Sequence, residues 1–352
     1  MNNSTIEKAP AGVIARLRSW ASADPHVTRL AIVLVLLLVV FAVMKPRNFG
    51  NVATWQSMAV QFPEYGLMAL GVMLTMIIGG IDLSVVAIAN LASIASAVMM
   101  LALAPKGSDA GTGYLAAFLA VPLCLVIGAI AGAFNGFLVA KIRIPAILVT
   151  LGTFELFTGI AIVMTAGKPL SGLPSQYSEV FAARVAGIPV PLIIFALAVV
   201  IVAVLMNRTP FGAKLYMLGS NEKAAAFSGL KTTSLTIRTY MTSGMLASAA
   251  GLVMLANYNS AKADYGSTYT LLAVLIVVLG GVNPNGGSGK LSGVVLGIVV
   301  LQVLSSFLNT FPNISNFYRP LIWGGVLLLV IVINQWYKPG GLSRFFQKRS
   351  AS

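Results

Sequence analysis

Apolar residues run through this chain in long stretches that are hydrophobic on every face of a helix. Residues 30–44 and 192–206, for example, contain no charged side chain. A membrane-spanning helix needs about 20 mostly apolar residues, whereas a strand of a membrane barrel alternates apolar and polar residues. The pattern therefore predicts an all-α polytopic membrane protein. Breaks at proline, glycine and charge clusters predict about ten spans, at 30–44, 57–78, 83–104, 114–139, 145–166, 189–206, 237–256, 270–282, 291–309 and 320–336.

Some of these spans are expected to be short or broken. Gly79-Gly80 and Gly280-Gly281 punctuate the regions of the third and eighth spans. A backbone break at membrane depth survives only inside protein, so we expect these two spans to be broken or partly re-entrant. An apolar and a small polar residue follow each glycine pair. This similarity between residues 79–82 and 280–283 is a weak internal echo, meaning a short sequence repeat, of the kind found in duplicated transporters.

Composition and charge narrow the possible classes of protein and predict the orientation of the chain in the membrane. Of the 352 residues, 58% are apolar and 9% are charged, whereas about a quarter of the residues in a soluble domain are charged. The net charge is +14, but the basic residues are spread over many loops, which favours membrane orientation over nucleic-acid binding. Sixteen of the 23 Lys and Arg residues fall in alternate segments. Those segments are expected in the cytoplasm, which places both termini inside.

This orientation divides the chain into three parts. Residues 1–29 form a cytoplasmic basic segment, residues 30–336 the transmembrane domain, and residues 337–352 a cytoplasmic basic tail. The chain has one cysteine, Cys124, and one histidine, His26. A CxxC site, a zinc site and a Ser-His-Asp site therefore lack their usual components, and we expect no metal, no cofactor and no catalytic residue.

Two glycine ladders predict close helix packing. Small residues at every fourth position let two helix backbones approach closely in lipid. We therefore expect the fourth and ninth spans to lie centrally in the bundle. The ladders are Gly128, Gly132 and Gly136 in the fourth span, and Gly289, Gly293 and Gly297 entering the ninth.

Few charged residues fall at membrane depth, and those that do are candidates for a translocation pathway. An acidic residue at the centre of a spanning helix costs about 2.5–3.5 kcal/mol on insertion scales, so it usually faces a bundle interior or a cavity. Glu64 and Asp82 are alternatively interfacial residues in contact with water, and Glu155 alternatively forms a structural pair. Asn90 and Asn135 are further candidates, although an interhelical hydrogen bond is the more ordinary role for each of them.

The segment at 207–238 is predicted to carry a short helix on the cytoplasmic side. Asn221 is a good N-cap, Glu222 favours a first turn, and the alanines from Ala224 favour helix. Gly229 is a good stop. Such a short helix is marginal alone, so it is either a docking element stabilised by a partner or a simple feature of the loop.

Four motifs in this chain resemble those of the ribose/xylose/galactose-type permeases of bacterial ATP-binding-cassette importers. The first is G-x-N-x-x-A-A-x-x-S-G at 219–229, which resembles the family's ATPase-coupling motif. The others are G-G-I-D-L-S-V at 79–85, N-G…P…T-L-G-T from 135 to 153, and V-L-G-G…G-G-x-G from 278 to 289. Two departures, Val86 and the segment at 268–274, leave the substrate open. The implied coupling residues are Gly219, Asn221, Glu222, Ala224, Ala225, Ser228 and Gly229.

The resemblance implies the permease subunit of an importer in the bacterial inner membrane. Its solute would be a monosaccharide or a sugar-like molecule such as a pentose, a hexose or a polyol. The implied partners are a second permease chain, two cytoplasmic ATPases and an extracytoplasmic solute-binding protein, besides membrane lipid. The sequence contains no G-x-x-x-x-G-K-[ST] motif, so ATP hydrolysis is expected in a partner and the chain is not expected to be an enzyme.

Two alternative functions remain at this stage. One is a secondary transporter coupled to protons or sodium through Glu64, Asp82 or Glu155, which needs no ATPase. The other keeps the importer architecture but carries another small solute, such as an amino acid.

Overall fold

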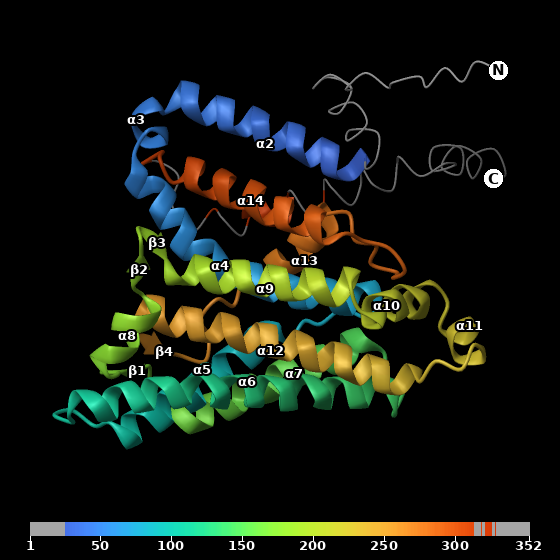
Figure 1. Cartoon of the computed structure of the whole chain (residues 1–352), viewed down its shortest axis with the longest axis horizontal. Helices are drawn as coiled ribbons and strands as arrows, with labels where there is room; N and C mark the ends of the chain where they lie inside the picture. The colour runs from blue at the N-terminus through green and yellow to red at the C-terminus, as the bar shows by residue number, and fades with distance from the viewer. Residues whose placement is uncertain (1–24, 313–317, 319–320, 326–327, 329–352) are drawn as a thin grey trace, which may run out of the picture.

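The computed structural model describes residues 25–312, 318, 321–325 and 328, and these residues are mostly helical (Figure 1). The helices are α2 (Pro25–Met44), α3 (Pro46–Phe49), α4 (Val52–Ile77), α5 (Val85–Leu103), α6 (Ala110–Ala140), α7 (Ala146–Thr165), α8 (Ser175–Phe181), α9 (Val190–Asn207), α10 (Pro210–Ser220), α11 (Glu222–Phe227), α12 (Thr232–Tyr258), α13 (Tyr269–Leu279) and α14 (Leu291–Leu308). The strands are β1 (Leu170–Ser171), β2 (Arg184–Val185), β3 (Ile188–Pro189) and β4 (Ser260–Ala261).

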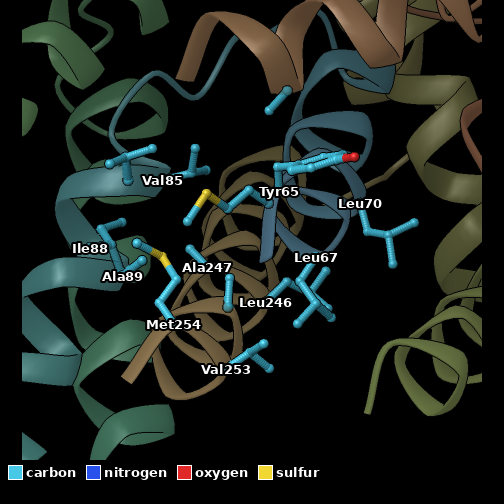
Figure 2. Packing of buried hydrophobic residues seen from close by; sticks show 14 of the residues in the cluster. Tyr65, Leu67, Leu70, Val85, Ile88, Ala89, Leu246, Ala247, Val253 and Met254 are labelled. Atoms are coloured by element: carbon cyan, nitrogen blue, oxygen red, sulfur yellow. The ribbon is translucent and has the colours of Figure 1, made fainter. Parts of the chain in front are cut away.

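Helices α4, α5 and α12 form the centre of the bundle. In the most apolar window of each helix, 83% of the residues are buried in α4, 72% in α5 and 78% in α12. Figure 2 shows their side chains converging, among them Leu67, Ile88 and Ala247, all fully buried. The peripheral helices α2 and α9 have mean hydropathies of 2.9 and 2.8, against 1.3 for α4 and α12. Helices surrounded by protein carry polar groups that a lipid-facing helix cannot, so here the least hydrophobic spans are the most buried.

The predicted spans coincide with helices wherever the structure describes them. Eight helices in the described residues are long and apolar enough to cross a membrane. Helix α13 has 11 residues, and at about 1.5 Å per residue it covers roughly half of a hydrocarbon core. The eighth predicted span is therefore short, as expected. Of the tenth, only residues 321–325 and 328 are described, so the total of ten spans and the orientation stay predictions.

The expectation of a broken third span is wrong. Helix α5 is continuous, because Gly79 and Gly80 lie in the connection before it. Gly79 has φ +83°, and the N–H of Gly80 donates to the carbonyl of Thr75 at 3.0 Å. Helix α4 therefore ends in the left-handed turn that glycine favours.

Helix α13 ends in the same kind of turn. Gly281 has φ +85°, and the N–H of Val282 donates to the carbonyl of Val277 at 3.2 Å. The internal echo in the sequence thus has a structural counterpart, but the register differs by one residue from the expected one. Gly79 corresponds to Gly281, whereas the sequence motifs pair it with Gly280.

The first glycine ladder packs against α12. A Cβ atom on Gly128 or Gly132 would overlap a carbonyl oxygen of α12, and one on Gly136 would lie 2.6 Å from the Cα of Ile237. However, only 39% of the most apolar window of α6 is buried, so the expectation that this helix is central is wrong. The ladder requires one tight interface and leaves the other faces of the helix unconstrained.

The second ladder is only partly helical. Gly293 and Gly297 lie on α14 and face α13, where a Cβ atom on Gly297 would be 3.1 Å from the carbonyl oxygen of Ile276. Gly289 precedes the helix and has φ +152°. Its expected place in a helical ladder is therefore wrong, because α14 begins only at Leu291.

Two small pairs of strands occur at the end of the bundle opposite α11 (Figure 1). Strand β1 pairs antiparallel with β4, and β2 forms a hairpin with β3. The buried Tyr177 of α8 donates to the carbonyl of Leu252 in α12 at 2.8 Å. The connections after α7 and α12 are thereby tied to each other and to the central helix.

Candidate functional site

Helix α11 is a capped element that projects from one end of the bundle (Figure 1). The side chain of Asn221 accepts from the N–H of Ala224 at 3.0 Å. At the other end, Gly229 has φ +82° and the N–H of Leu230 donates to the carbonyl of Ala225 at 3.1 Å. The cap and the stop were both predicted, because each depends on one residue within the segment.

Most of the surface of α11 is exposed. Ala225 is its buried residue, while Glu222, Ala224 and the flanking Ser228 are exposed. Phe227 is 93% exposed, more than any other large apolar side chain in the described residues. Sequence reasoning missed Phe227, although an aromatic residue at the end of an alanine-rich polar helix is a usable signal. An exposed aromatic side chain of this kind is typical of an interface anchor.

The end of α10 sits directly on the end of α4. A Cβ atom on Gly219 would overlap the carbonyl oxygen of Ile77 and would lie 2.6 Å from the nitrogen of Gly287. The N–H of Gly287 donates to the same Ile77 carbonyl at 2.9 Å. Next to it, a Cβ atom on Gly286 would lie 2.8 Å from the nitrogen of Gly79. We call this contact of residues 77–79, 219 and 286–287 the glycine junction.

A tyrosine strengthens the junction from α10. The hydroxyl of Tyr216 donates to the carbonyl of Gly289 at 2.8 Å. Burial raises the pKa of Tyr216, so the hydroxyl keeps its proton and remains a donor. Around the junction, the segment at 207–238 carries five basic residues and one acidic residue, Glu222. Its surface is therefore complementary to an acidic partner.

Asp82 lies fully buried in the connection between α4 and α5. One carboxylate oxygen accepts from the backbone N–H of Ser84 at 3.0 Å and from its hydroxyl at 2.6 Å. The other accepts from the hydroxyl of Ser243 in α12 at 2.8 Å. The Ser84 hydroxyl accepts in turn from the amide of Asn135 in α6 at 2.7 Å. Asp82 and Asn135 are thus brought together in one network that joins three elements.

Glu64 forms a second, separate network on α4. The carboxylate is 2% exposed and accepts from the side chains of Asn257 at 2.7 Å, Tyr258 at 2.6 Å and Tyr269 at 3.3 Å. These donors come from the end of α12 and the start of α13. Glu64, in the middle of α4, therefore connects this helix to the ends of two others, and its expected alternative position in water at the interface is wrong.

Asn90 has a comparable role in the same region. Its amide donates to the carbonyls of Ala263 and Tyr265, each at 2.9 Å. The side chain holds the connection between α12 and α13 against α5, which agrees with its more ordinary interpretation as an interhelical bond.

The expected inward orientation of Glu155 is wrong for this chain. Helix α7 buries Thr150, Thr153 and Phe157, spaced three and four residues apart. Glu155 falls on another face and is exposed. A Cβ atom on Gly152 would meet nothing within 4 Å. Apolar residues surround Glu155 along the sequence, so hydropathy alone gives α7 no preferred inner face.

Comparison with known proteins identifies the family. The family model described as "Branched-chain amino acid transport system / permease component" matches residues 55–333. The chain belongs to this permease family. It is 34% identical over 304 residues to the ribose import permease protein of Bacillus subtilis, covering 86% of this chain and 90% of that protein. No solved structure matches this permease at a significant level.

Other relatives of this permease differ in the solute that they are named for. The ribose import permease protein of Escherichia coli K12 is 30% identical over 307 residues, covering 86% of this chain and 92% of that protein. The autoinducer 2 import system permease protein of Photorhabdus temperata is 29% identical over 310 residues, covering 86% and 89%. These relatives confirm the resemblance read from the motifs. Residues 55–333, which the family model matches, include α11 and both polar networks.

Proposed function

We propose that this chain is one of two permease subunits of an ATP-binding-cassette importer in the bacterial inner membrane, and that it carries a monosaccharide or a sugar-like solute. The relatives named for ribose and autoinducer 2 support this class of solute. The observation that carries the coupling role is α11, a capped and exposed helix with an aromatic side chain at its tip. Its partners would be two cytoplasmic ATPases, a second permease chain and an extracytoplasmic solute-binding protein.

The exposed surface of α11 suits an ATPase with a cleft that is apolar inside and acidic at its rim. Phe227 would enter the cleft, because burial of a 93% exposed ring is favourable. The basic residues of the segment at 207–238 would face the rim, where charge complementarity orients the two proteins. Asn221 and Gly229 would act indirectly by fixing the ends of the helix.

The glycine junction would transmit ATPase movement into the bundle. Only backbone atoms separate Gly219 from Ile77 and Gly287, so no flexible side chain absorbs a displacement of α10. A shift of α11 would therefore reach the end of α4 and favour one of two bundle arrangements. Transport then follows as a population shift between outward-open and inward-open states.

Uptake should depend on ATP and not on ion gradients. In cells that express this chain with its partner proteins, depletion of ATP by arsenate is expected to abolish accumulation of the labelled sugar. A protonophore should leave uptake unchanged while glycolysis supplies ATP, and a strain that lacks the chain gives the background. Loss of uptake with the protonophore at constant ATP would instead support the secondary transporter.

The face of α7 that carries Glu155 would contact the second permease chain. Glu155 is the tenth of 20 residues in this helix, and a carboxylate facing lipid at mid-membrane costs about 2.5–3.5 kcal/mol. The neighbouring Gly152 and Gly159 leave open space, into which side chains of a second chain could pack. A pathway between the two permeases would then place Glu155 beside the solute.

Photo-crosslinking tests this face. A benzophenone side chain at Leu156, which is 48% exposed on α7, is expected to yield an adduct with a second permease chain. The matched control is the same substitution at Phe118, 72% exposed on α6, which should yield lipid adducts only. Mass spectrometry of the adducts distinguishes an identical partner from a paralogue. Lipid adducts alone at both positions would contradict the proposed interface.

A further inference from the structure

A groove opens between α2, α9 and α14, at the end of the bundle where α10 lies (Figure 1). Its volume is about 960 Å³, at the upper end of the roughly 300–1,000 Å³ that is usual for small-molecule sites in proteins. Neither Glu64 nor Asp82 lines it. The groove is therefore a feature of the bundle separate from the two polar networks.

The walls of the groove are apolar along the spans. Val199 and Met206 line it from α9, Leu296 and Val299 from α14, and Leu34 from α2. Val199 lies eight residues before the end of α9, and Val299 lies eight residues after the start of α14. At 1.5 Å per residue the walls extend about 12 Å from these helix ends, which is most of one half of a hydrocarbon core about 30 Å thick. The walls therefore occupy the depth at which the acyl chains of one leaflet lie.

The mouth of the groove is polar and basic. Asn207 ends α9 here, Lys290 and Ser292 flank the start of α14, and all three residues are exposed. Burial raises the pKa of Tyr216, and the charge of Lys290 lies close enough to oppose that rise. None of the described residues that line the groove is acidic. The groove is thus apolar inside and positive at its mouth.

The start of α14 adds hydrogen-bond donors at this mouth. Lys290 is the N-cap and makes no capping bond with its side chain, so the positive end of the helix dipole faces the mouth without a side-chain cap. The hydroxyl of Tyr216 already donates to the carbonyl of Gly289. The ammonium of Lys290 and the hydroxyl of Ser292 are therefore the side-chain donors for an anion in this position.

Three occupants of the groove can be compared. A sugar carries many hydroxyl groups, and each of them needs a hydrogen-bond partner when it is buried, which the apolar walls do not offer. Residues 326–352 of this chain include basic but no acidic side chains, so they bring no counter-charge to Lys290. A phospholipid with a net negative charge places its acyl chains against the walls and its phosphate at the mouth. It is the one occupant of the three that matches both parts of the groove.

We propose that an anionic diacyl phospholipid of the surrounding membrane binds in this groove, with its acyl chains between α9 and α14 and its phosphate at Lys290 and Ser292. Gly287 and Gly289 also line the groove, so the lipid would contact the loop that forms the glycine junction. Tyr216 joins this loop to α10, and the lipid would therefore stabilise the place where α10 meets the bundle. The proposal does not depend on the solute or on the ATPase, so it stands or falls separately from the proposed function.

Thermal unfolding of the purified full chain in detergent tests the selectivity for the headgroup. Titration with dioleoyl phosphatidylglycerol is expected to raise the Tm in a saturable manner, because a ligand that binds only the folded state stabilises it. Dioleoyl phosphatidylcholine has the same acyl chains but no net charge, and inorganic phosphate has no acyl chain. The first should need a concentration about tenfold higher, and the second should have no effect. Lys290→Gln should raise the half-saturating concentration of phosphatidylglycerol by about tenfold, because it removes a hydrogen bond between charged groups.

Lys141→Gln is the matched control for the loss of charge. Lys141 is exposed after the end of α6 and does not line the groove, so this variant should respond to phosphatidylglycerol like the unmodified chain. The proposal is overturned if the two lipids act at the same concentration, if inorganic phosphate reproduces the effect, or if the two lysine variants respond alike.

Photo-crosslinking in native membranes tests the occupant directly. A diazirine side chain of the size of leucine at Leu296 is expected to label anionic phospholipid well above its share of the membrane lipids. The same side chain at Phe137, 43% exposed on α6, should label lipids in proportion to their abundance, and Lys290→Gln should abolish the enrichment at Leu296. Adducts of Leu296 with residues 326–352 would assign the groove to that segment. That result, or equal lipid proportions at the two positions, would overturn the proposal.

Discussion

Replacing Phe227 by glutamate is expected to abolish solute uptake and recovery of the ATPase on detergent pull-down, with an unchanged amount of the chain in the membrane. The ring is 93% exposed in the isolated chain, so its loss removes no internal packing. At an interface, an aromatic anchor contributes about 2 kcal/mol or more, which corresponds to about 30-fold in affinity. A carboxylate in its place would also be buried without a partner, which adds a desolvation cost.

Phe227→Leu is the matched control for this prediction. Leucine keeps an apolar side chain at the tip of α11 and favours helix, so ATPase recovery should remain substantial. Pull-down yield and uptake are both measured at matched membrane abundance. Unchanged ATPase recovery and uptake with Phe227→Glu would reject α11 as the docking element.

Gly219→Leu is expected to lower the stability of the bundle and to suppress uptake even where the chain still folds. A side chain at this position would overlap the Ile77 carbonyl and displace its hydrogen bond with the N–H of Gly287. Overpacking costs about 1–3 kcal/mol, and the higher helix propensity of leucine returns less than about 1 kcal/mol of that. The measurements are the Tm in detergent and uptake at matched abundance.

Ala213→Leu provides the control on the same helix. Ala213 is an exposed residue of α10, so the added side chain has room and should leave the Tm and uptake close to those of the unmodified chain. If Gly219→Leu behaved the same way, the glycine junction would have no mechanical role and the proposed route from α11 to α4 would fail.

Features that depend on neighbouring residues could be predicted from the sequence. The cap at Asn221 and the stop at Gly229 define α11 within a few residues, and long apolar runs define the spans. The glycine junction could not be predicted this way, because it joins Ile77, Gly219 and Gly287 from distant parts of the chain. The motif around Gly219 indicates coupling but not the backbone contact that it makes.

The orientation of helices that are apolar on all sides could not be predicted either. Helix α7 has no polar face from which to infer its inner side, so Glu155 was expected inward although it is exposed. The same limitation applies to α6, where the glycine ladder reports one tight contact with α12 and not a central position. In a soluble protein, water would impose the missing pattern of polar and apolar faces.

The matching turns at Gly79 and Gly281 have a mechanical consequence. Gly79 ends α4, and the loop that follows Gly281 returns to contact Gly79 through Gly286. Through Gly219, α10 therefore contacts both related segments at one place. A displacement of α10 at this contact would therefore act on both segments at once. It would tilt α4 and α13 together, without a separate contact for each helix.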